Sequence, residues 1–358
     1  MNGRPLRILL VHPGASWSTA DVEAGLRYGL KAHGVEVIPY RLDERITIAG
    51  KFLHVRWRQL RKTADLPKPN KVDVVYHASV GALEMAMRRD VDVVVIVSAM
   101  LFHPDVILMM KRAGLRVAIV FTESPYDHAE ELRVARLVDG CWTNERTMLA
   151  AFRAVNPHAG YLPHAWHPET HGGAMAVADT VPRHDVVFVG SGFPERIAFF
   201  NAIDWTGIDL GLYGSWKGLG LRRRTLAYVK GPTIDNHFTA ALYRRAAIGL
   251  NLYRSRDSQR RPVRGESLSP RAYELAACGA FHLSDERAEV QEVFGDLVPT
   301  FTSPTEAAAL IRLWLRDPAG RARIAAALPA TVAEASWIHR AGIVLADLTT
   351  LVHSVWVA

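Results

Sequence analysis

The segment 266–280 contains the residues whose types and spacing best suit chemistry. Ser269 is a favoured N-cap residue and Pro270 suits the first position of a helix, so we expect a helix to begin here. The free N–H groups and positive dipole end of such a helix bind anions, and a diphosphate would fit. Glu274 falls in the first helical turns, where its carboxylate can accept two hydrogen bonds from a ribose cis-diol. Glu266 precedes the N-cap, placed to reach the group beyond the phosphates.

Titratable side chains also follow strand-like segments in the first half of the chain. His12 comes directly after the first apolar run. Glu123, Asp127 and His128 lie in one short loop after the apolar run 117–121. Three titratable groups at the carboxyl end of a strand suit ligand binding or proton transfer. Each of them singly is at least as well explained as a residue that caps its own loop.

Short apolar strands alternating with helices must position these residues. In the first half we expect a helix over 20–33, ending at Gly34 as a natural C′ residue. The strands expected there are 7–11, 35–40, 72–76, 91–97 and 115–121. Continuous apolar strands that alternate with helices indicate a parallel sheet covered on both faces.

The same pattern restarts in the second half, with a helical C-terminal segment over 307–352. The strands expected there are 184–190, 208–214, 247–252 and 279–283. The intervening segment 163–183 has little periodicity and reads as a linker. We therefore expect an α/β protein with two Rossmann-like domains that face each other across a cleft. Ligands of such sheets bind beyond the carboxyl ends of the strands.

The predicted domain bounds follow from these segments. The first Rossmann-like domain is expected over 1–170 and the second over 171–335. The last segment, 336–358, is expected to form a helix that packs back on the first domain.

At this point the sequence resembles a family. The Glu266-x7-Glu274 pattern, the Ala-Cys-Gly-Ala turn after it and the Phe-Val-Gly at 188–190 resemble retaining, nucleotide-sugar-dependent GT-B glycosyltransferases of the group-1 type. Further segments are similar to the CgeB-like (spore-maturation-protein-like) branch of that family: 161–164, 188–197, 249–252, 271–281 and 284–287. The resemblance covers nearly the whole second domain and the first domain loosely.

The resemblance implies a donor site in the second domain. Glu274 would hold the donor ribose, and Glu266 would touch the transferred sugar, although the CgeB-like branch often lacks a glutamate there. The residues at the helix start would cradle the diphosphate: Ser267, Leu268, Ser269, Pro270 and Arg271. The donor is expected to be a UDP- or GDP-linked sugar, with no bound cofactor and no metal.

The turn after the strand 184–190 belongs to the same implied site. Gly190, Ser191 and Gly192 would let the backbone approach the donor, although two glycines also suit an ordinary tight turn. Arg196 would neutralise phosphate charge. The group-1 pattern has a Lys a few residues later, which this chain lacks, so the run 254–264, including Arg264, is the expected source of a second cation.

The first domain would then carry the acceptor side. His12, Glu123, Asp127 and His128 are the candidates for acceptor binding or proton transfer there. His103, Asn144 and Glu145 are weaker candidates of the same kind.

Composition and charge bound the remaining possibilities. The chain has 358 residues, is 49% hydrophobic and carries 43 Lys+Arg against 36 Asp+Glu, a formal charge of +7. This length suits two domains of about 150–200 residues, and the apolar fraction excludes a disordered chain. Two cysteines cannot form a disulfide framework. The run 91–101 is far shorter than the roughly twenty residues that span a bilayer, so we expect a cytoplasmic protein without a membrane span.

The excess positive charge predicts an anionic partner but does not identify it. The acceptor is either a small molecule, polysaccharide or protein hydroxyl, or DNA with hydroxymethylated bases. For DNA, the basic clusters 51–62, 222–224 and 254–264 would contact phosphates and the base would flip into the cleft. A non-catalytic nucleotide- or nucleic-acid-binding module on the same fold is the alternative of another class. The sequence leaves the oligomeric state undefined.

Overall fold

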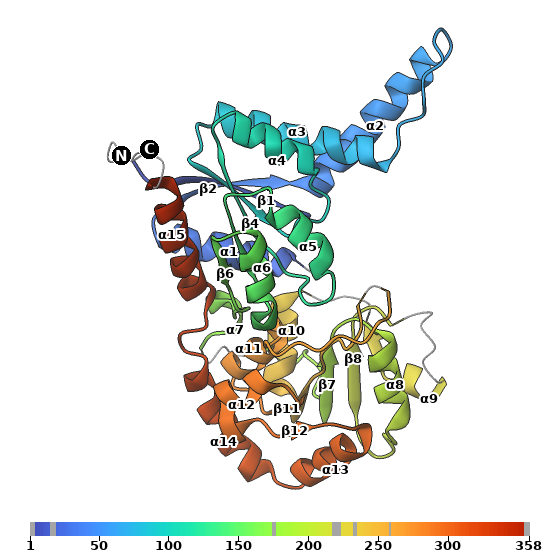
Figure 1. The fold of residues 1–358 in the computed structure, drawn as a ribbon. Coiled ribbons are helices and arrows are strands. Elements are labelled where there is room, and N and C mark those ends of the chain that lie inside the picture. The colour runs from blue at the N-terminus through green and yellow to red at the C-terminus, as the bar shows by residue number, and fades with distance from the viewer. Residues whose placement is uncertain are drawn as a thin grey trace. The chain divides into compact units, whose positions relative to one another are not determined.

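The computed structural model describes residues 4–14, 19–173, 177–216, 223–231, 235–257 and 259–353 (Figure 1). Its contacts divide the chain into two compact units. Unit 1 comprises Met1–Pro163 and Ile338–Ala358, and unit 2 comprises His164–Trp337. Each unit is built around a six-stranded sheet whose strand pairs are all parallel. The predicted α/β class with two Rossmann-like sheets is confirmed.

Unit 1 has the strand order β2-β1-β3-β4-β5-β6. Its strands are β1 (Arg7–His12), β2 (Glu36–Arg41), β3 (Val93–Val97), β4 (Arg116–Val120), β5 (Gly140–Thr143) and β6 (Ala159–Tyr161). Its helices are α1 (Ala20–Ala32), α2 (Leu42–Leu60), α3 (Lys71–Arg88), α4 (Pro104–Arg112), α5 (His128–Ala135), the short 3-10 turn η1 (Arg146–Met148), α6 (Leu149–Val155) and α15 (Trp337–His353). β3 is buried along its whole length, as a central parallel strand covered on both faces requires.

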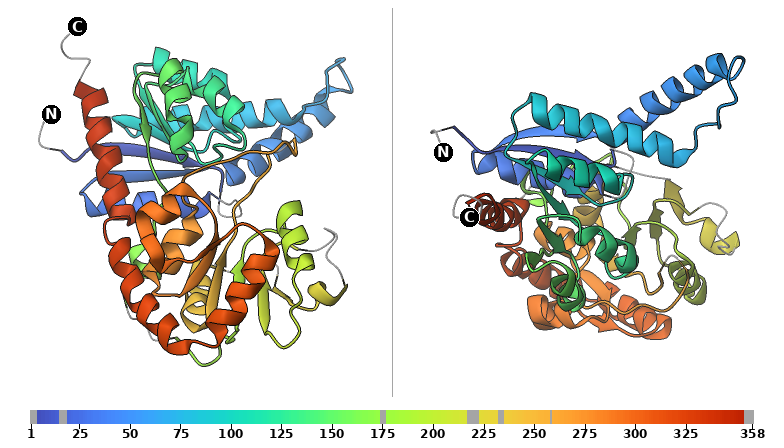
Figure 2. Two further views of the ribbon diagram at one scale, coloured as in Figure 1. Left: turned by 60° about the horizontal axis from the view of Figure 1, so that its bottom comes forward. Right: turned by 45° about the horizontal axis from the view of Figure 1, so that its top comes forward.

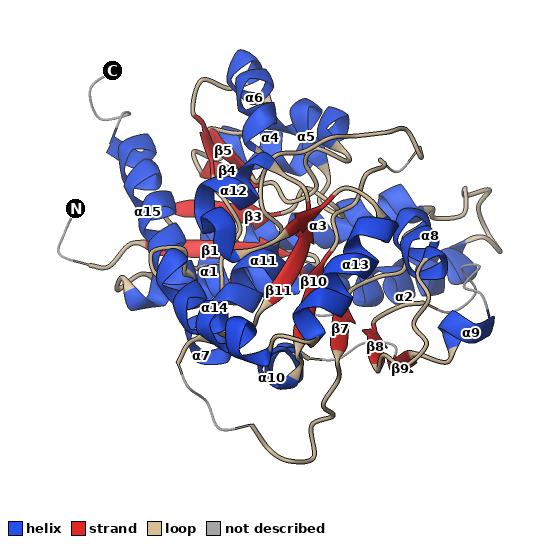
Figure 3. Cartoon of the chain, turned by 90° about the horizontal axis from the view of Figure 1, so that it is seen from below, coloured by secondary structure: helices blue, strands red, loops and turns tan. Residues whose placement is uncertain are grey.

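Unit 2 has the strand order β12-β11-β10-β7-β8-β9. Its strands are β7 (Val186–Val189), β8 (Leu210–Tyr213), β9 (Val229–Gly231), β10 (Ile248–Asn251), β11 (His282–Asp285) and β12 (Thr300–Phe301). Its helices are α7 (Pro168–His171), α8 (Pro194–Ala202), α9 (Arg223–Leu226), α10 (Asn236–Arg245), α11 (Pro270–Ala277), α12 (Ala288–Phe294), η2 (Gly295–Leu297), α13 (Pro304–Leu315) and α14 (Pro318–Thr331). Figure 3 shows the strands of this sheet flanked by helices.

Apolar side chains fill both faces of the unit 2 sheet. Phe188 packs against Phe200 and Trp216 on one face, with ring centroids 5.4 and 5.8 Å away. The opposite face of the sheet is covered by a second cluster, which includes Val187 of β7 and Leu275 of α11. The sheet is therefore covered on both sides, and its polar chemistry is confined to the strand ends.

The strand predicted over 72–76 is wrong, because these residues lie in α3. Asn70 caps this helix by accepting hydrogen bonds from the amides of Val72 and Asp73, and the Asp73 side chain accepts one from the Asn70 amide. This reciprocal capping box starts a helix and outweighs the β-branched composition of the run. The sequence analysis also missed the short strands β5, β6, β9 and β12.

The division between the units falls at Pro163 rather than at residue 170. Trp166 belongs to unit 2 because its indole N–H donates to the Val332 carbonyl at 2.7 Å and its backbone amide donates to Ala335 at 3.2 Å. In unit 1, α15 packs against the end of the sheet, where Asp347 accepts a hydrogen bond from the Trp142 indole at 2.7 Å. In the described part of the chain, no helix has the length and apolarity needed to cross a membrane.

Candidate functional site

The start of α11 is the centre of the candidate site in unit 2. Ser269 occupies the N-cap position and Pro270 the first turn, which confirms the predicted helix start. The Ser269 side chain does not cap the helix, because its hydroxyl donates to Asn251 Oδ1 at 2.8 Å. The first-turn amides of α11 therefore have no side-chain cap and suit an anionic ligand.

Arg271 lies across the carboxyl ends of two neighbouring strands. Its Nε donates to the Val189 carbonyl at the end of β7, at 2.8 Å. Its Nη1 lies 3.3 Å from Asn251 Oδ1, at the end of β10, and 3.4 Å from the Leu252 carbonyl. The guanidinium also sits over the Phe188 ring, 4.6 Å from its centroid. These contacts fix a positive charge at the strand ends, where ligands of parallel sheets bind.

Two glycines of the turn after β7 have packing roles. A Cβ atom at Gly190 would lie 2.6 Å from Arg271 Nη2, so glycine leaves the room that the guanidinium occupies. A Cβ atom at Gly192 would lie 2.7 Å from the Trp216 ring. Ser191, between them, is exposed. Gly192 thus makes room for the Trp216 ring, whereas Gly190 makes space for Arg271 at the site itself.

Arg196 is buried beneath this turn. Its Nη1 donates to the Ser191 carbonyl at 3.0 Å and its Nη2 to the Leu252 carbonyl at 2.7 Å. Its guanidinium also stacks near the rings of Phe188 and Phe193. These bonds tie the β7–α8 turn to the end of β10.

Arg287, which follows β11, braces the opposite side of the same edge. Its Nη1 donates to the Ser267 carbonyl at 2.9 Å, and its Nη2 lies 3.4 Å from the Arg254 carbonyl. Its guanidinium lies 3.8 Å from the Tyr253 ring centroid. Arg287 therefore ties the loop before α11 to residues 253–254 beyond β10. The charges of Arg287, Arg196 and Arg271 all act on the Asp285 carboxyl at this edge.

In the loop before α11, some polar groups already have hydrogen-bond partners within the protein. The Leu268 side chain is buried, and its amide donates to the buried carboxylate of Glu289 at 2.5 Å. Ser267 is also buried, while Glu266 and Arg264 are exposed. The predicted cradle residues therefore lie together, but the Leu268 amide already has an anionic partner inside the protein.

Glu274 is half-buried in the second turn of α11. Burial raises the pKa of Tyr243. The nearby charge of Glu274 raises this pKa further, and the nearby charge of Arg271 lowers it. Glu274 and Arg271 therefore lie near each other on one side of the helix.

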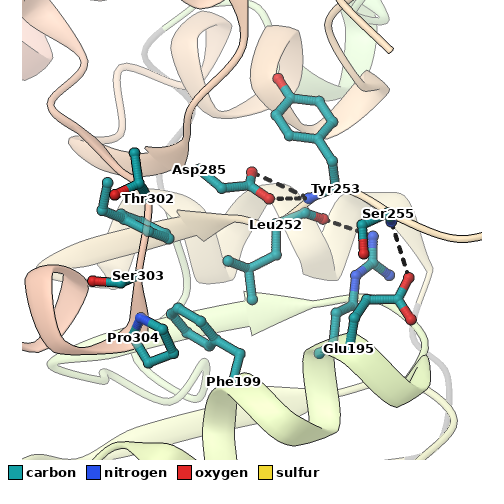
Figure 4. Close-up of a pocket in the computed structure, with 11 residues that line it drawn as sticks. Glu195, Phe199, Leu252, Tyr253, Ser255, Asp285, Thr302, Ser303 and Pro304 are labelled. Carbon is teal, nitrogen blue, oxygen red and sulfur yellow. Dashed lines mark hydrogen bonds between the residues drawn. The ribbon is translucent and has the colours of Figure 1, made fainter. Parts of the chain in front are cut away.

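A cavity of about 140 Å³ opens at the ends of β10, β11 and β12 (Figure 4). Asp285 lies in its wall and accepts the Tyr253 amide through both carboxylate oxygens, at 3.2 and 3.0 Å. Burial raises the pKa of Asp285 to about 6, against the lowering effects of the Tyr253 amide and the nearby arginines. Glu195 accepts the Ser255 amide at 3.1 Å on the other side. The sequence analysis assigned no role to either carboxylate, although Asp285 lies two residues beyond the predicted strand 279–283 and is the last residue of β11.

In unit 1, His12 ends β1 and is buried. Its Nε2 lies 4.0 Å from the buried Glu23 carboxylate, and its Nδ1 has no hydrogen-bond partner among the described residues. Burial lowers the pKa of His12, although the Glu23 charge opposes this. The lowered pKa favours the neutral imidazole. A buried nitrogen without a partner among the described residues suits a ligand-binding position.

The loop after β4 is organised by Glu131 of α5. This buried carboxylate accepts the Glu123 amide at 2.9 Å and a short hydrogen bond from the Ser124 hydroxyl. Burial raises its pKa to about 7, although both hydrogen bonds act in the opposite direction. His128 Nδ1 lies 2.9 Å from the Pro125 carbonyl. Sequence reasoning missed Glu131 because it lies on the helix and not in the loop.

The remaining candidates of unit 1 have local contacts. Asp127 is the N-cap residue of α5, without a side-chain cap. Asn144 donates to the Ser124 carbonyl at 3.0 Å, and the buried Glu145 accepts from both the amide and the hydroxyl of Thr147. His103 accepts from the Asp105 amide at the start of α4. The structure thus brings Glu123, Asp127 and His128 together in one loop.

The basic clusters have different surroundings. The side chains of Lys51, Arg56, Arg58, Arg61 and Lys62 are exposed at the distal end of α2. In the run 254–264, the buried Asp257 pairs with Arg261 at 2.7 Å. Arg222 lies outside the described residues, as do the side chains of 223 and 224.

Over the described ranges, no group of three or more His, Cys, Asp or Glu side chains is arranged to hold a metal ion.

Comparison with known proteins relates this geometry to a family. A family described as glycosyl transferase-like matches residues 195–346, which is less than half of the chain. No curated protein matches the chain in sequence.

Solved structures of similar fold cover nearly the whole chain. An alpha,alpha-trehalose-phosphate synthase (UDP-forming) from Burkholderia vietnamiensis has a TM-score of 0.63 at 13% identity, covering 99% of this chain and 100% of that one. A structure described as trehalose-6-phosphate from E. coli bound with UDP-2-fluoro glucose has a TM-score of 0.61 at 12% identity, covering 97% and 99%. An alpha-glucosyltransferase in complex with UDP has a TM-score of 0.61 at 12% identity, covering 96% and 100%.

At these identities the structural likeness shows the fold alone, and it confirms the predicted GT-B architecture. The family match covers most of the unit that holds the α11 site and extends into α15.

Proposed function

We propose that the chain is a retaining glycosyltransferase of the CgeB-like branch that moves a sugar from a nucleoside-diphosphate sugar to an acceptor hydroxyl. The single observation that carries the proposal is Arg271, held across the ends of β7 and β10 beside an uncapped helix start. A fixed guanidinium beside a helix start that no side chain caps stabilises the charge that develops on a departing diphosphate. Nucleotide-bound structures of the same fold, one with UDP and one with a UDP-linked sugar analogue, support a nucleotide-sugar donor.

We assign the donor contacts as follows. Arg271 and the first-turn amides of α11 bind the diphosphate. Glu274 accepts hydrogen bonds from the ribose hydroxyls, and the exposed Glu266 reaches the transferred sugar. Retention follows from front-face transfer through an oxocarbenium-like transition state, in which the diphosphate leaves on the side from which the acceptor enters. The arginines and the helix start stabilise the leaving group without a metal ion.

We assign Arg196 a positioning role instead of direct phosphate contact. Both of its terminal nitrogens donate to main-chain carbonyls, those of Ser191 and Leu252. It holds the β7–α8 turn in place around the donor.

Unit 1 supplies the acceptor side in this proposal. The neutral His12, with its unsatisfied nitrogen, binds the acceptor hydroxyl. The loop with Glu123, Asp127 and His128 contacts the rest of the acceptor. The acceptor is a small-molecule, polysaccharide or protein hydroxyl, and hydroxymethylated DNA is the alternative that the positive charge of the chain favours.

Donor binding by the Glu274→Ala variant tests the assignment. We expect a thermal-shift screen of UDP- and GDP-linked sugars to identify a donor that raises the melting temperature. Isothermal calorimetry with that donor should then show no binding to Glu274→Ala, while circular dichroism shows a folded protein. Glu286→Ala, which removes an exposed carboxylate after β11, is the matched control and should bind normally. Unchanged donor affinity in Glu274→Ala would sink the assignment.

Two further assays separate the alternatives. Slow donor hydrolysis without an acceptor is expected of a retaining transferase, and none is expected of a non-catalytic binding module. Binding to duplex DNA that falls steeply with salt would support a DNA acceptor, and no binding at low salt would remove it. Nuclear magnetic resonance of the product reports whether the anomeric configuration is retained.

A further inference from the structure

The α2–α3 hairpin of unit 1 exposes an unusual amount of apolar surface. Figures 1 and 2 show the two helices projecting together from the sheet. No residue between 51 and 77 is buried. Eight of the twelve large apolar side chains exposed in the described part of the chain belong to this hairpin: Ile48, Phe52, Val55, Leu60, Leu66, Val72, Tyr76 and Met87. Isolated exposed apolar residues are common, but such a concentration marks an interaction surface.

Part of the apolar surface of α2 is used to hold the hairpin together. Trp57 donates from its indole nitrogen to the Leu66 carbonyl at 3.0 Å, and Arg61 and Lys68 stack over its ring. A Cβ atom at Gly50 would lie 3.8 Å from Val74 of α3, so the helices approach closely there. These contacts between α2 and α3, here called the seam, account for the half-buried side chains of α2. They do not account for its exposed apolar side chains.

The exposed residues form a second stripe on another side of α2. Ile48, Phe52 and Val55 are spaced four and three residues apart, which places them on one face of the helix. They are 59%, 52% and 52% exposed. The Phe52 ring reaches the His77 ring of α3 at 5.7 Å, so the stripe continues to the edge of the second helix. We call these three residues the outer stripe.

Cations flank the outer stripe on both sides. Between residues 45 and 62 the chain has six basic residues and no acidic one: Arg45, Lys51, Arg56, Arg58, Arg61 and Lys62. By helical spacing, Lys51 and Arg58 lie along one flank of the stripe, and Arg45 and Arg56 lie along the other. Arg61 and Lys62 follow directly after the end of α2. An apolar stripe between rows of cations is the pattern of a helix that lies in the interface of an anionic membrane.

We infer that the distal α2–α3 hairpin docks on an anionic lipid bilayer, with the outer stripe inserted at the headgroup boundary and the flanking cations on lipid phosphates. Charge complementarity selects this partner. A second copy of the chain is disfavoured because a two-fold interface would place the same row of cations against itself. Nucleic acid would satisfy the cations but offers no apolar phase for Ile48 and Val55.

Vesicle flotation of the full chain tests the inference. We expect binding to phosphatidylcholine vesicles that contain phosphatidylglycerol and little binding to phosphatidylcholine alone. Binding should weaken as salt is raised. Exchanging Lys51, Arg58 and Lys62 for alanine should reduce the partition coefficient by about fivefold for each cation removed. Lys31, Arg112 and Lys230, exposed on other elements, provide the matched triple alanine control and should leave binding nearly unchanged.

The apolar contribution is tested separately. Ile48→Ser, Phe52→Ser and Val55→Ser combined should reduce vesicle binding by about a hundredfold, which corresponds to roughly 3 kcal/mol for the three side chains together. Leu313→Ser with Ile343→Ser, 60% and 40% exposed elsewhere, is the control. Thermal unfolding should be similar in all variants, because none of these side chains is buried.

Three results would overturn the inference. The first is no binding to phosphatidylglycerol vesicles at low salt. The second is vesicle binding that the serine substitutions leave intact, together with tight binding to duplex DNA. The third is a concentration-dependent dimer that the serine substitutions abolish, without vesicle binding. All these measurements omit nucleotide sugar, so a failure of the proposed donor site would not affect them.

Discussion

At the scale of single residues, Arg271 links the start of α11 to the sheet. Its contacts to Val189, Asn251 and Leu252 use the planar fork of the guanidinium, which presents several donors in fixed directions. A lysine ammonium is a point charge on a flexible stem and cannot make these contacts together. Position as well as charge therefore matters at this residue.

We predict that Arg271→Lys weakens donor binding by at least about tenfold, because the charge remains but its fixed position is lost. Calorimetric titration with the donor sugar nucleotide measures the effect. Arg112→Lys, at an exposed arginine of α4, serves as the control and should bind as the parent does. Equal affinity in both variants would show that Arg271 does not contact the donor.

Glu131 makes the stability of unit 1 depend on pH. Its pKa is about 7 in the folded protein, against an ordinary value of 4.5, because burial penalises the charged form. The folded state therefore holds the proton more tightly. The protonated Glu131 carboxyl contributes fully to the free energy of unfolding below pH 4.5, and this contribution is lost as the pH rises to about 7. A shift of this size corresponds to about 3 kcal/mol.

We predict that Glu131→Gln removes this pH dependence, because glutamine stays neutral. The free energy of unfolding of the parent, relative to the variant, should fall by about 3 kcal/mol between acidic and mildly alkaline pH. Urea unfolding of both proteins over this range gives the difference. Asp285 has a raised pKa of its own but is present in both proteins, so its effect cancels. A difference that does not change with pH would contradict the prediction.

At the scale of elements, the α2–α3 hairpin is held by local interactions because its distal half has no buried residue. The capping box of Asn70 and Asp73 starts α3, and the Trp57 seam joins the helices. We therefore expect the distal half of the hairpin to open without unfolding of the core of unit 1. Segments with few buried contacts open locally without global unfolding.

We predict that Asn70→Ala speeds local opening of α3 without lowering global stability. Loss of an N-cap costs about 1 kcal/mol, which corresponds to roughly fivefold faster amide hydrogen exchange at residues 71–77. Hydrogen exchange followed by mass spectrometry resolves this segment. Asn156→Ala is the contrasting variant, because this buried side chain donates to the Ala135 and Val138 carbonyls and its loss should lower global stability. Unchanged exchange over 71–77 would show that the cap is not limiting.

At the scale of the whole molecule, unit 1 is closed by a helix that comes from the far end of the chain. Leu348 and Val344 of α15 are fully buried, and Asp347 holds the Trp142 indole. A Cβ atom at Gly140 would lie 2.6 Å from the Leu351 side chain, so glycine permits this close packing. The first unit is therefore complete only when the last helix has been made.

We predict that Leu348→Ala lowers the free energy of unfolding of unit 1 by about 2–5 kcal/mol, because it leaves a cavity in a packed interface. Ile343→Ala, 40% exposed on the same helix, should have little effect. Differential scanning calorimetry with and without nucleotide sugar separates the units, since the ligand should stabilise unit 2. A single transition that both the ligand and the substitution shift would show that the two units unfold as one.

The chain's local signals determined much of this protein. The Ser-Pro pair at 269–270 set the start of α11, Gly34 ended α1, and most strands were evident from their continuous apolar runs. These features depend on backbone preferences and on burial, which are properties of a few consecutive residues. The same local reasoning failed at 72–76, where a capping box outweighed β-branched composition.

Only the tertiary structure decided which of the chemically able residues meet and which are already occupied. In the folded chain Arg271 contacts the ends of β7 and β10, and the Leu268 amide donates to Glu289. Glu131 accepts a hydrogen bond from the loop after β4 and holds that loop in place. The tertiary structure also left the side chains of the outer stripe of α2 more than half exposed. The physical reason is that these outcomes depend on contacts between residues far apart in sequence. Residue types and spacing show what a side chain can do, but the packing of distant elements determines its partner.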